Sequence, residues 1–178
     1  MKKWSYGVAA AGLLAAMALG QTPVGTRSDR SLTQTGPAAE KGSVEFLFPE
    51  QVTVPANKAS TVTLHFRVAP GMHINSHSPK DAFLIPTVFT LPEGGGVQLE
   101  AVTYPAGAEF ALPLEPKNKL SVYTGEFVLL ARIVAAPGDH LVEAKLRYQA
   151  CDNNACMPPR TLIVAMDVVG TGNEGTRE

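Results

Sequence analysis

The sequence predicts an all-β fold, an immunoglobulin-like antiparallel β-sandwich, and two observations lead to this prediction. First, hydrophobic and polar residues alternate in several short runs, which is typical of strands with one buried face. Second, glycine and proline separate these runs by short turns, and no segment of helical periodicity is long enough to connect parallel strands. Seven or more strands within about 130 residues favour a sandwich, with a closed barrel as the alternative.

The candidate strands follow one another between these turns. The alternation is clearest in residues 61–68, where Val62, Leu64, Phe66 and Val68 share one face and polar residues share the other. The remaining candidates, in chain order, are 43–48, 86–91, 97–104, the long apolar stretch 120–134, 141–149 and 161–169.

The first 20 residues have the features of a secretory signal peptide. Lys2 and Lys3 precede an apolar run from about Val8 to Leu19, and small residues stand before Gln21. The run is shorter than the roughly 20 residues that cross a bilayer. No later stretch is long and apolar enough to cross one, so we expect a soluble periplasmic domain with no membrane span after signal removal.

Composition sets the other boundaries and excludes one class of partner. Residues 21–41 are polar and rich in glycine and proline, which predicts a flexible tether, and residues 170–178 predict a disordered tail. The sandwich domain is therefore expected to span residues 42–169. The formal net charge is -1, and no run of five or more basic residues occurs, so we expect no nucleic-acid partner.

Both cysteines lie in the segment YQACDNNACMPP. Cys151 ends one candidate strand, Cys156 precedes the next, and the Asp and Asn residues between them favour a turn, so a disulfide is feasible. The two prolines that follow stiffen the exit from the loop. If the strand alternation continues, Cys151 lies on the face opposite Tyr148, toward solvent or a covering loop.

Three interpretations of this pair stay open. The bridge could staple the hairpin of a non-catalytic binding or assembly module. Alternatively, the sulfurs of Cys151, Cys156 and Met157 with an imidazole of HINSHS could bind copper(I) or zinc, but the familiar zinc spacings are missing, and we expect no metal and no bound cofactor. An oxidising compartment together with one closely spaced pair favours the third interpretation, thiol-disulfide exchange.

The sequence also indicates how reactive these thiols would be. No helix N-terminus is expected near them to lower a thiol pKa, and Asp152 beside Cys151 disfavours a thiolate. We therefore expect exchange to depend on a partner that supplies the attacking thiolate.

The cysteine segment resembles a known family. YQACDNNACMPPRTLIVAMDV is similar to the signature of the N-terminal periplasmic domain of the thiol:disulfide interchange protein DsbD, and PGMHINSHSP, FLIPTVFTLP and the stretch from YPAG through LSVYTGEFVLLARI resemble other parts of that domain. The resemblance covers about residues 43–169.

This resemblance implies an immunoglobulin-like sandwich in which Cys151 and Cys156 form the redox-active centre. The pair would receive reducing equivalents from a membrane-embedded thiol reductant and pass them to thioredoxin-fold proteins, with Cys156 exchanging and Cys151 resolving. The family also shields its disulfide with a cap loop, for which residues 108–119 with Phe110 are the candidate here. His73 would act as a base or pack near the sulfurs.

Two departures from the family pattern affect these expectations. The family's transmembrane helices and C-terminal thioredoxin-like domain have no counterpart in this sequence, so a stand-alone form would take its electrons from another polypeptide. The loop between the cysteines also has only four residues, DNNA.

Overall fold

The computed structural model describes residues 42–48, 51–112 and 115–172. The predicted signal peptide 1–20, the predicted tether 21–41 and positions 173–178 of the predicted tail therefore lie outside the described residues. The described part of the chain folds into strands and turns without a helix, and so it contains no helical segment that could cross a membrane. The expected all-β class is confirmed.

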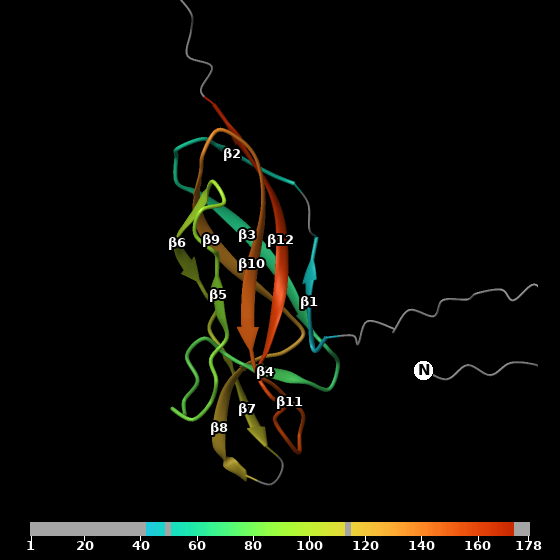
Figure 1. Ribbon diagram of the computed structural model, residues 1–178. Helices are drawn as coiled ribbons and strands as arrows, with labels where there is room; N and C mark the ends of the chain where they lie inside the picture. The colour runs from blue at the N-terminus through green and yellow to red at the C-terminus, as the bar shows by residue number, and fades with distance from the viewer. Residues whose placement is uncertain (1–41, 49–50, 113–114, 173–178) are drawn as a thin grey trace, which may run out of the picture. The chain divides into compact units, whose positions relative to one another are not determined.

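Two four-stranded sheets form the sandwich in the described residues (Figure 1). The first sheet is antiparallel throughout, and its strands lie in the order β1 (Val44–Leu47), β3 (Ser60–Val68), β9 (Glu126–Ala135) and β6 (Val97–Thr103). The second sheet has the order β2 (Val52–Pro55), β12 (Arg160–Thr171), β10 (Gly138–Tyr148) and β5 (Val88–Thr90). Its edge strand β2 runs parallel to β12, which is an exception to the predicted antiparallel pairing.

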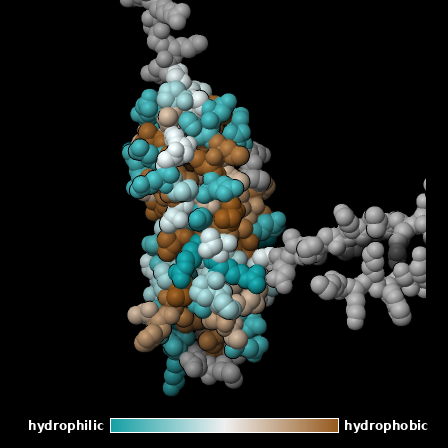
Figure 2. All heavy atoms as spheres, in the orientation of Figure 1, coloured by the Kyte–Doolittle hydropathy of each residue, from teal (hydrophilic) through white to brown (hydrophobic). Residues whose placement is uncertain are grey.

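The hydrophobic core lies between these two sheets, as the alternation predicted. The apolar residues of β3 are buried, and so are those of β10 and β12 that face them. Within the core the rings of Phe66, Phe127 and Tyr123 stack in series, with centroids 5.3 Å and 4.9 Å apart. The alternate residues of the strands face outward, and on the face in view hydrophilic and hydrophobic residues are interspersed (Figure 2). This burial supplies the main driving force for the fold.

A third sheet extends the sandwich and was not predicted (Figure 1). Its order is β11 (Ala150–Cys151), β4 (His73–Asn75), β8 (Glu115–Tyr123) and β7 (Ala108–Leu112). Three connections join this sheet directly to a main sheet: β4 follows β3, β9 follows β8, and β11 follows β10. The third sheet is therefore held in place by strands from both layers of the sandwich.

Several predicted elements differ in their limits from the observed strands, among them the stretch 120–134 and the last strand. The stretch 120–134 contains the end of β8 and most of β9, separated by a turn in which Gly125 has a φ of 57°, a conformation that favours glycine. The last strand, β12, continues through Thr171, two residues beyond the expected end of the domain at 169.

Candidate functional site

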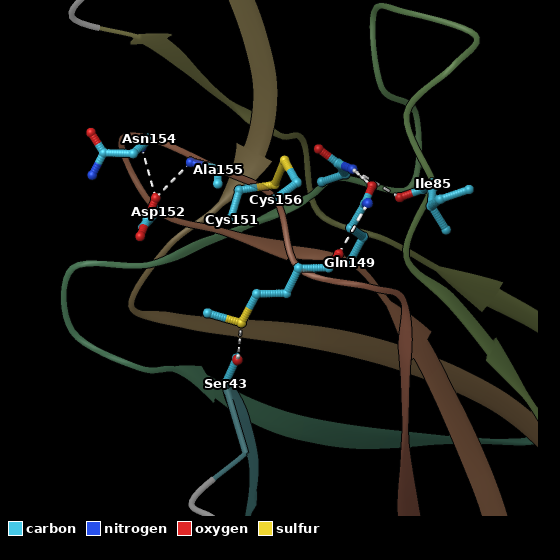
Figure 3. The surroundings of a disulfide bond; sticks show 10 residues. Ser43, Ile85, Gln149, Cys151, Asp152, Asn154, Ala155 and Cys156 are labelled. Carbon is cyan, nitrogen blue, oxygen red and sulfur yellow. Dashed lines mark hydrogen bonds between the residues drawn. A yellow bond between two sulfur atoms is a disulfide. The ribbon is translucent and has the colours of Figure 1, made fainter.

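The two cysteines are joined by a disulfide at the base of the tight turn between β11 and β12 (Figure 3). Their Cα atoms lie 3.9 Å apart, and the two residues form an antiparallel bridge. Asp152 N donates to the carbonyl of Ala155 at 3.0 Å, and Met157 N donates to the carbonyl of Ala150 at 2.8 Å. The turn expected from the Asp and Asn residues is thus present, and it aligns the two sulfurs.

Asp152 organises this turn. Its Oδ1 accepts hydrogen bonds from the backbone N of Asn154 at 2.7 Å and of Ala155 at 2.8 Å (Figure 3). These two donors lower the pKa of the Asp152 carboxyl below its usual value, and the nearby His73 ring lowers it further. A negative charge is consequently fixed beside Cys151.

A second set of hydrogen bonds fixes the chain on both sides of the cysteines. Gln149 donates from Nε2 to the carbonyl of Met157 at 3.2 Å, and its Oε1 accepts from Nδ2 of Asn75 at 3.3 Å. The same Nδ2 donates to the carbonyl of Ile85 at 3.0 Å (Figure 3). Asn75, fully buried in β4, therefore connects the cysteine segment to the 76–87 connection. Nothing in the sequence signalled this role of Asn75, because its neighbours in MHINSHS are mostly polar and show no alternation.

The two cysteines differ sharply in exposure. Cys156 is exposed, whereas Cys151 is only 2% exposed. Of the two expectations for Cys151, exposure to solvent is wrong, and the residue is instead covered by other parts of the chain. The alternation of β10 ends at Tyr148, because after Gln149 the chain leaves the second sheet and pairs with β4 in the third. The register of β10 consequently does not extend to Cys151.

The third sheet has a core face and a site face. Ile74 pairs with both Ala150 and Tyr123, and all three belong to the hydrophobic core. Directly paired residues in an antiparallel sheet share a face, and neighbours along a strand lie on opposite faces. Cys151 and its partner His73 therefore lie on the other face, which we call the site face.

Phe110 reaches the site face from the β7–β8 hairpin. Tyr123 lies on the core face, and Leu120, three positions before it in β8, therefore lies on the site face. Phe110 pairs with Leu120 and so lies on the site face as well. Its ring centroid lies 4.3 Å from that of His73, with an angle of 34° between the planes. The segment expected to act as a cap thus brings Phe110 against the residue paired with Cys151, although residues 108–112 and 115–123 form a hairpin of strands.

A hollow of about 520 Å³ opens beside this contact. It is bounded by His73, Phe110 and Asn153 on one side and by the β3–β4 turn and the turn after β8 on the other. Arg67 and Glu126 at its edge are joined by an ion pair of 2.7 Å. The hollow reaches the cysteine loop and offers space for a side chain of another molecule.

The described residues contain no group of three or more His, Cys, Asp or Glu side chains arranged to hold a metal ion. Met157, one of the soft ligands considered from the sequence, accepts a hydrogen bond at its sulfur from Ser43 Oγ at 4.0 Å. The cysteine sulfurs are bonded to each other.

Comparison with known proteins identifies one family. Residues 43–167 match the family described as thiol:disulfide interchange protein DsbD, N-terminal. Two solved structures are similar. The first is the reduced N-terminal domain of DsbD from Neisseria meningitidis, at 21% identity and a TM-score of 0.43; the match covers 66% of this chain and 82% of that chain. The second is the N-terminal periplasmic domain of ScsB from Proteus mirabilis, at 12% identity and a TM-score of 0.46; the match covers 70% of this chain and 44% of that chain. No curated protein matches the sequence.

Proposed function

Since this chain belongs to the family of the N-terminal domain of the thiol:disulfide interchange protein DsbD, we propose that it is a thiol-disulfide oxidoreductase that acts as an electron relay. Cys151 and Cys156 form the redox couple. The domain works in the periplasm after the signal peptide 1–20 is removed, and it carries reducing equivalents from a membrane-embedded thiol reductant to thioredoxin-fold proteins. Its chemistry uses the two sulfurs and no bound cofactor.

The difference in exposure between the two cysteines carries this proposal. Cys156 is exposed at a tight turn and Cys151 is buried beneath it. An incoming thiolate therefore attacks Cys156 Sγ, the Cys151–Cys156 bond breaks, and its electron pair stays on Cys151 Sγ. The donor's second thiol then attacks the donor sulfur of the mixed disulfide, which leaves the donor with a disulfide and both Cys151 and Cys156 reduced. In the second half of the relay the Cys156 thiolate attacks the acceptor's disulfide, and the Cys151 thiolate then attacks Cys156 in this mixed disulfide, which re-forms the bridge and releases the acceptor as a dithiol. A buried second cysteine suits this resolving role, because it is shielded from other acceptors.

A redox titration of the purified domain against glutathione tests the proposal. An exchanging couple equilibrates with buffers in the range of thioredoxin-like proteins, whereas a structural bridge resists reduction to below about -300 mV. The folded state is followed by circular dichroism throughout. If the bridge opens only as the domain unfolds, the domain is a binding or assembly module with a structural disulfide.

Trapping of a mixed disulfide tests the roles of the two cysteines. The Cys151→Ser variant keeps the exposed thiol and is expected to form a stable mixed disulfide with an oxidised thioredoxin-fold protein. The matched Cys156→Ser variant keeps only the buried thiol and is expected to trap far less. Equal trapping by the two variants would contradict the assigned order of attack.

A further inference from the structure

The imidazole of His73 has an unused nitrogen at the site. In the described residues the buried side-chain atoms without a hydrogen-bond partner are His73 Nε2 and Asn75 Oδ1, and both belong to β4. His73 is only 2% exposed, so bulk solvent does not reach this nitrogen. A buried polar atom without a partner is costly, and such an atom in a native fold calls for an explanation.

The position of His73 is fixed relative to Cys151. The two residues are directly paired in the β4–β11 ladder, which places their Cβ atoms about 5 Å apart on the same face. The Phe110 ring packs against the imidazole on the site face. The ring is therefore held beside Cys151 by one strand and covered by another.

Opening of the disulfide leaves a buried thiolate, which a hydrogen bond from this nitrogen would stabilise. When a partner's thiolate bonds to Cys156 Sγ, the electron pair of the broken bond is left on Cys151 Sγ, in a buried position. Burial disfavours a thiolate and makes it a poor leaving group. A hydrogen bond from a neighbouring ring nitrogen offsets this cost.

We propose that His73 is a positioning residue for the exchange, which forms a hydrogen bond through Nε2 to the sulfur of Cys151 once the disulfide opens. The inference deepens the proposed function and rests on it. In the oxidised protein Nε2 has no hydrogen-bond partner, and the Cys151 sulfur carries no charge because it is bonded to Cys156. As the bond breaks, the ring N–H donates a hydrogen bond to the departing thiolate and keeps its own proton. When Cys151 ends as a thiol, its proton comes from the solvent.

The charges around His73 agree with this role. Burial lowers the pKa of His73, while the carboxylate of Asp152 acts in the opposite direction, so the environment favours the neutral ring, which carries one N–H. On the side of the hollow, Arg67 and Glu126 neutralise each other. Phe110, from the hairpin, brings no charge.

The first test measures the thiol itself. In a Cys156→Ser background, the pKa of the Cys151 thiol is read from its ¹³Cβ shift, with and without His73→Phe. Phe keeps an aromatic ring against Phe110 but has no nitrogen, and we expect it to raise the pKa of Cys151 by about one unit or more, a tenfold loss of thiolate at neutral pH. His65→Phe, the same substitution at a ring that packs on Phe48, is the control and should leave the value unchanged. An unchanged Cys151 pKa in His73→Phe overturns the inference.

The second test measures the reaction. In the protein with both cysteines, His73→Phe should slow reduction by dithiothreitol by about threefold or more, because a leaving thiol of higher pKa departs more slowly. In a Cys151→Ser background the same substitution should not alter alkylation of Cys156, which shows that it acts through Cys151. An equal rate in the first comparison, or an altered rate in the second, overturns the inference.

Failure of the inference can be told from failure of the proposed function. If dithiothreitol does not reduce the folded wild-type domain, the proposed function is wrong. If it does, and His73→Phe has no effect, only the role of His73 is wrong. Should His73→Phe not fold, ¹⁵N spectra of Cys156→Ser decide: we expect the His73 Nε2 shift to follow the Cys151 titration with the same midpoint, and two independent midpoints overturn the inference.

Discussion

The difference between the two cysteines predicts a measurable difference in thiol reactivity. Cys151→Ser leaves a thiol on an exposed residue, and Cys156→Ser leaves one that is 2% exposed. We expect Ellman's reagent to react with the thiolate of Cys156 much faster than with that of Cys151. The ratio depends on the free energy needed to uncover Cys151.

That free energy can be estimated from the contacts on the site face. Moving Phe110 away from His73 loses an aromatic pair with a centroid separation of 4.3 Å, which is worth about 1 kcal/mol. Exposing the half-buried Phe110 ring costs about 1 kcal/mol more. The sum of about 2 kcal/mol corresponds to a ratio of about 30.

Stopped-flow absorbance measures both rates over a range of pH, so that each can be expressed per thiolate. In 6 M guanidinium the rates of the two variants should differ by about twofold at most, because burial of Cys151 is lost. Phe110→Ala should raise the rate of Cys151 and leave that of Cys156 unchanged. A native ratio near one would refute the reasoning.

Contacts elsewhere give three more expectations. Tyr123→Phe removes a hydroxyl that donates to Pro105 O and accepts from His77 N, so urea unfolding should show a loss of about 1 to 3 kcal/mol; an unchanged midpoint would count against it. Gly170→Ala places a Cβ against the carbonyl of Ala136 and should cost about 1 to 3 kcal/mol in the same assay, while Gly172→Ala, with open space around it, should be neutral. The pKa of Asp152 is lowered in the folded state, so its stabilisation of the turn is present above the ordinary Asp pKa and is lost as pH falls; an NMR titration of its carboxyl with a midpoint at or above 3.8 would contradict this.

The long strands were predictable because their signal is local. In residues 61–68 and 141–148 the alternation of apolar and polar residues matches the burial found in β3 and β10. The short strands β4, β7 and β11 have two to five residues each, too few to show a period. They form because other strands offer them hydrogen-bonding edges, which a local pattern does not encode.

The candidate site likewise has one feature that is local in the sequence and others that depend on the whole fold. The closeness of Cys151 and Cys156 follows from a turn of four residues, and the sequence predicted it. The burial of Cys151 depends on the change of sheet after Tyr148, and the contact of His73 with Phe110 joins residues 37 positions apart. Such contacts arise from the fold as a whole, so the sequence left the role of His73 open between a base and a packing residue.

The hairpin that carries the cysteines is held together by the pairing of β10 with β12 and does not depend on the disulfide. Eleven consecutive residue pairs join β10 to β12, ending at Tyr148↔Arg160 next to the cysteine turn. Closing a loop this short adds only about 2 kcal/mol in the chain-entropy estimate, and the ladder has already brought the two ends together. In the proposed exchange the bond would open and re-form while this ladder keeps the scaffold in shape, so a donor and an acceptor arriving in turn would meet the same docking surface.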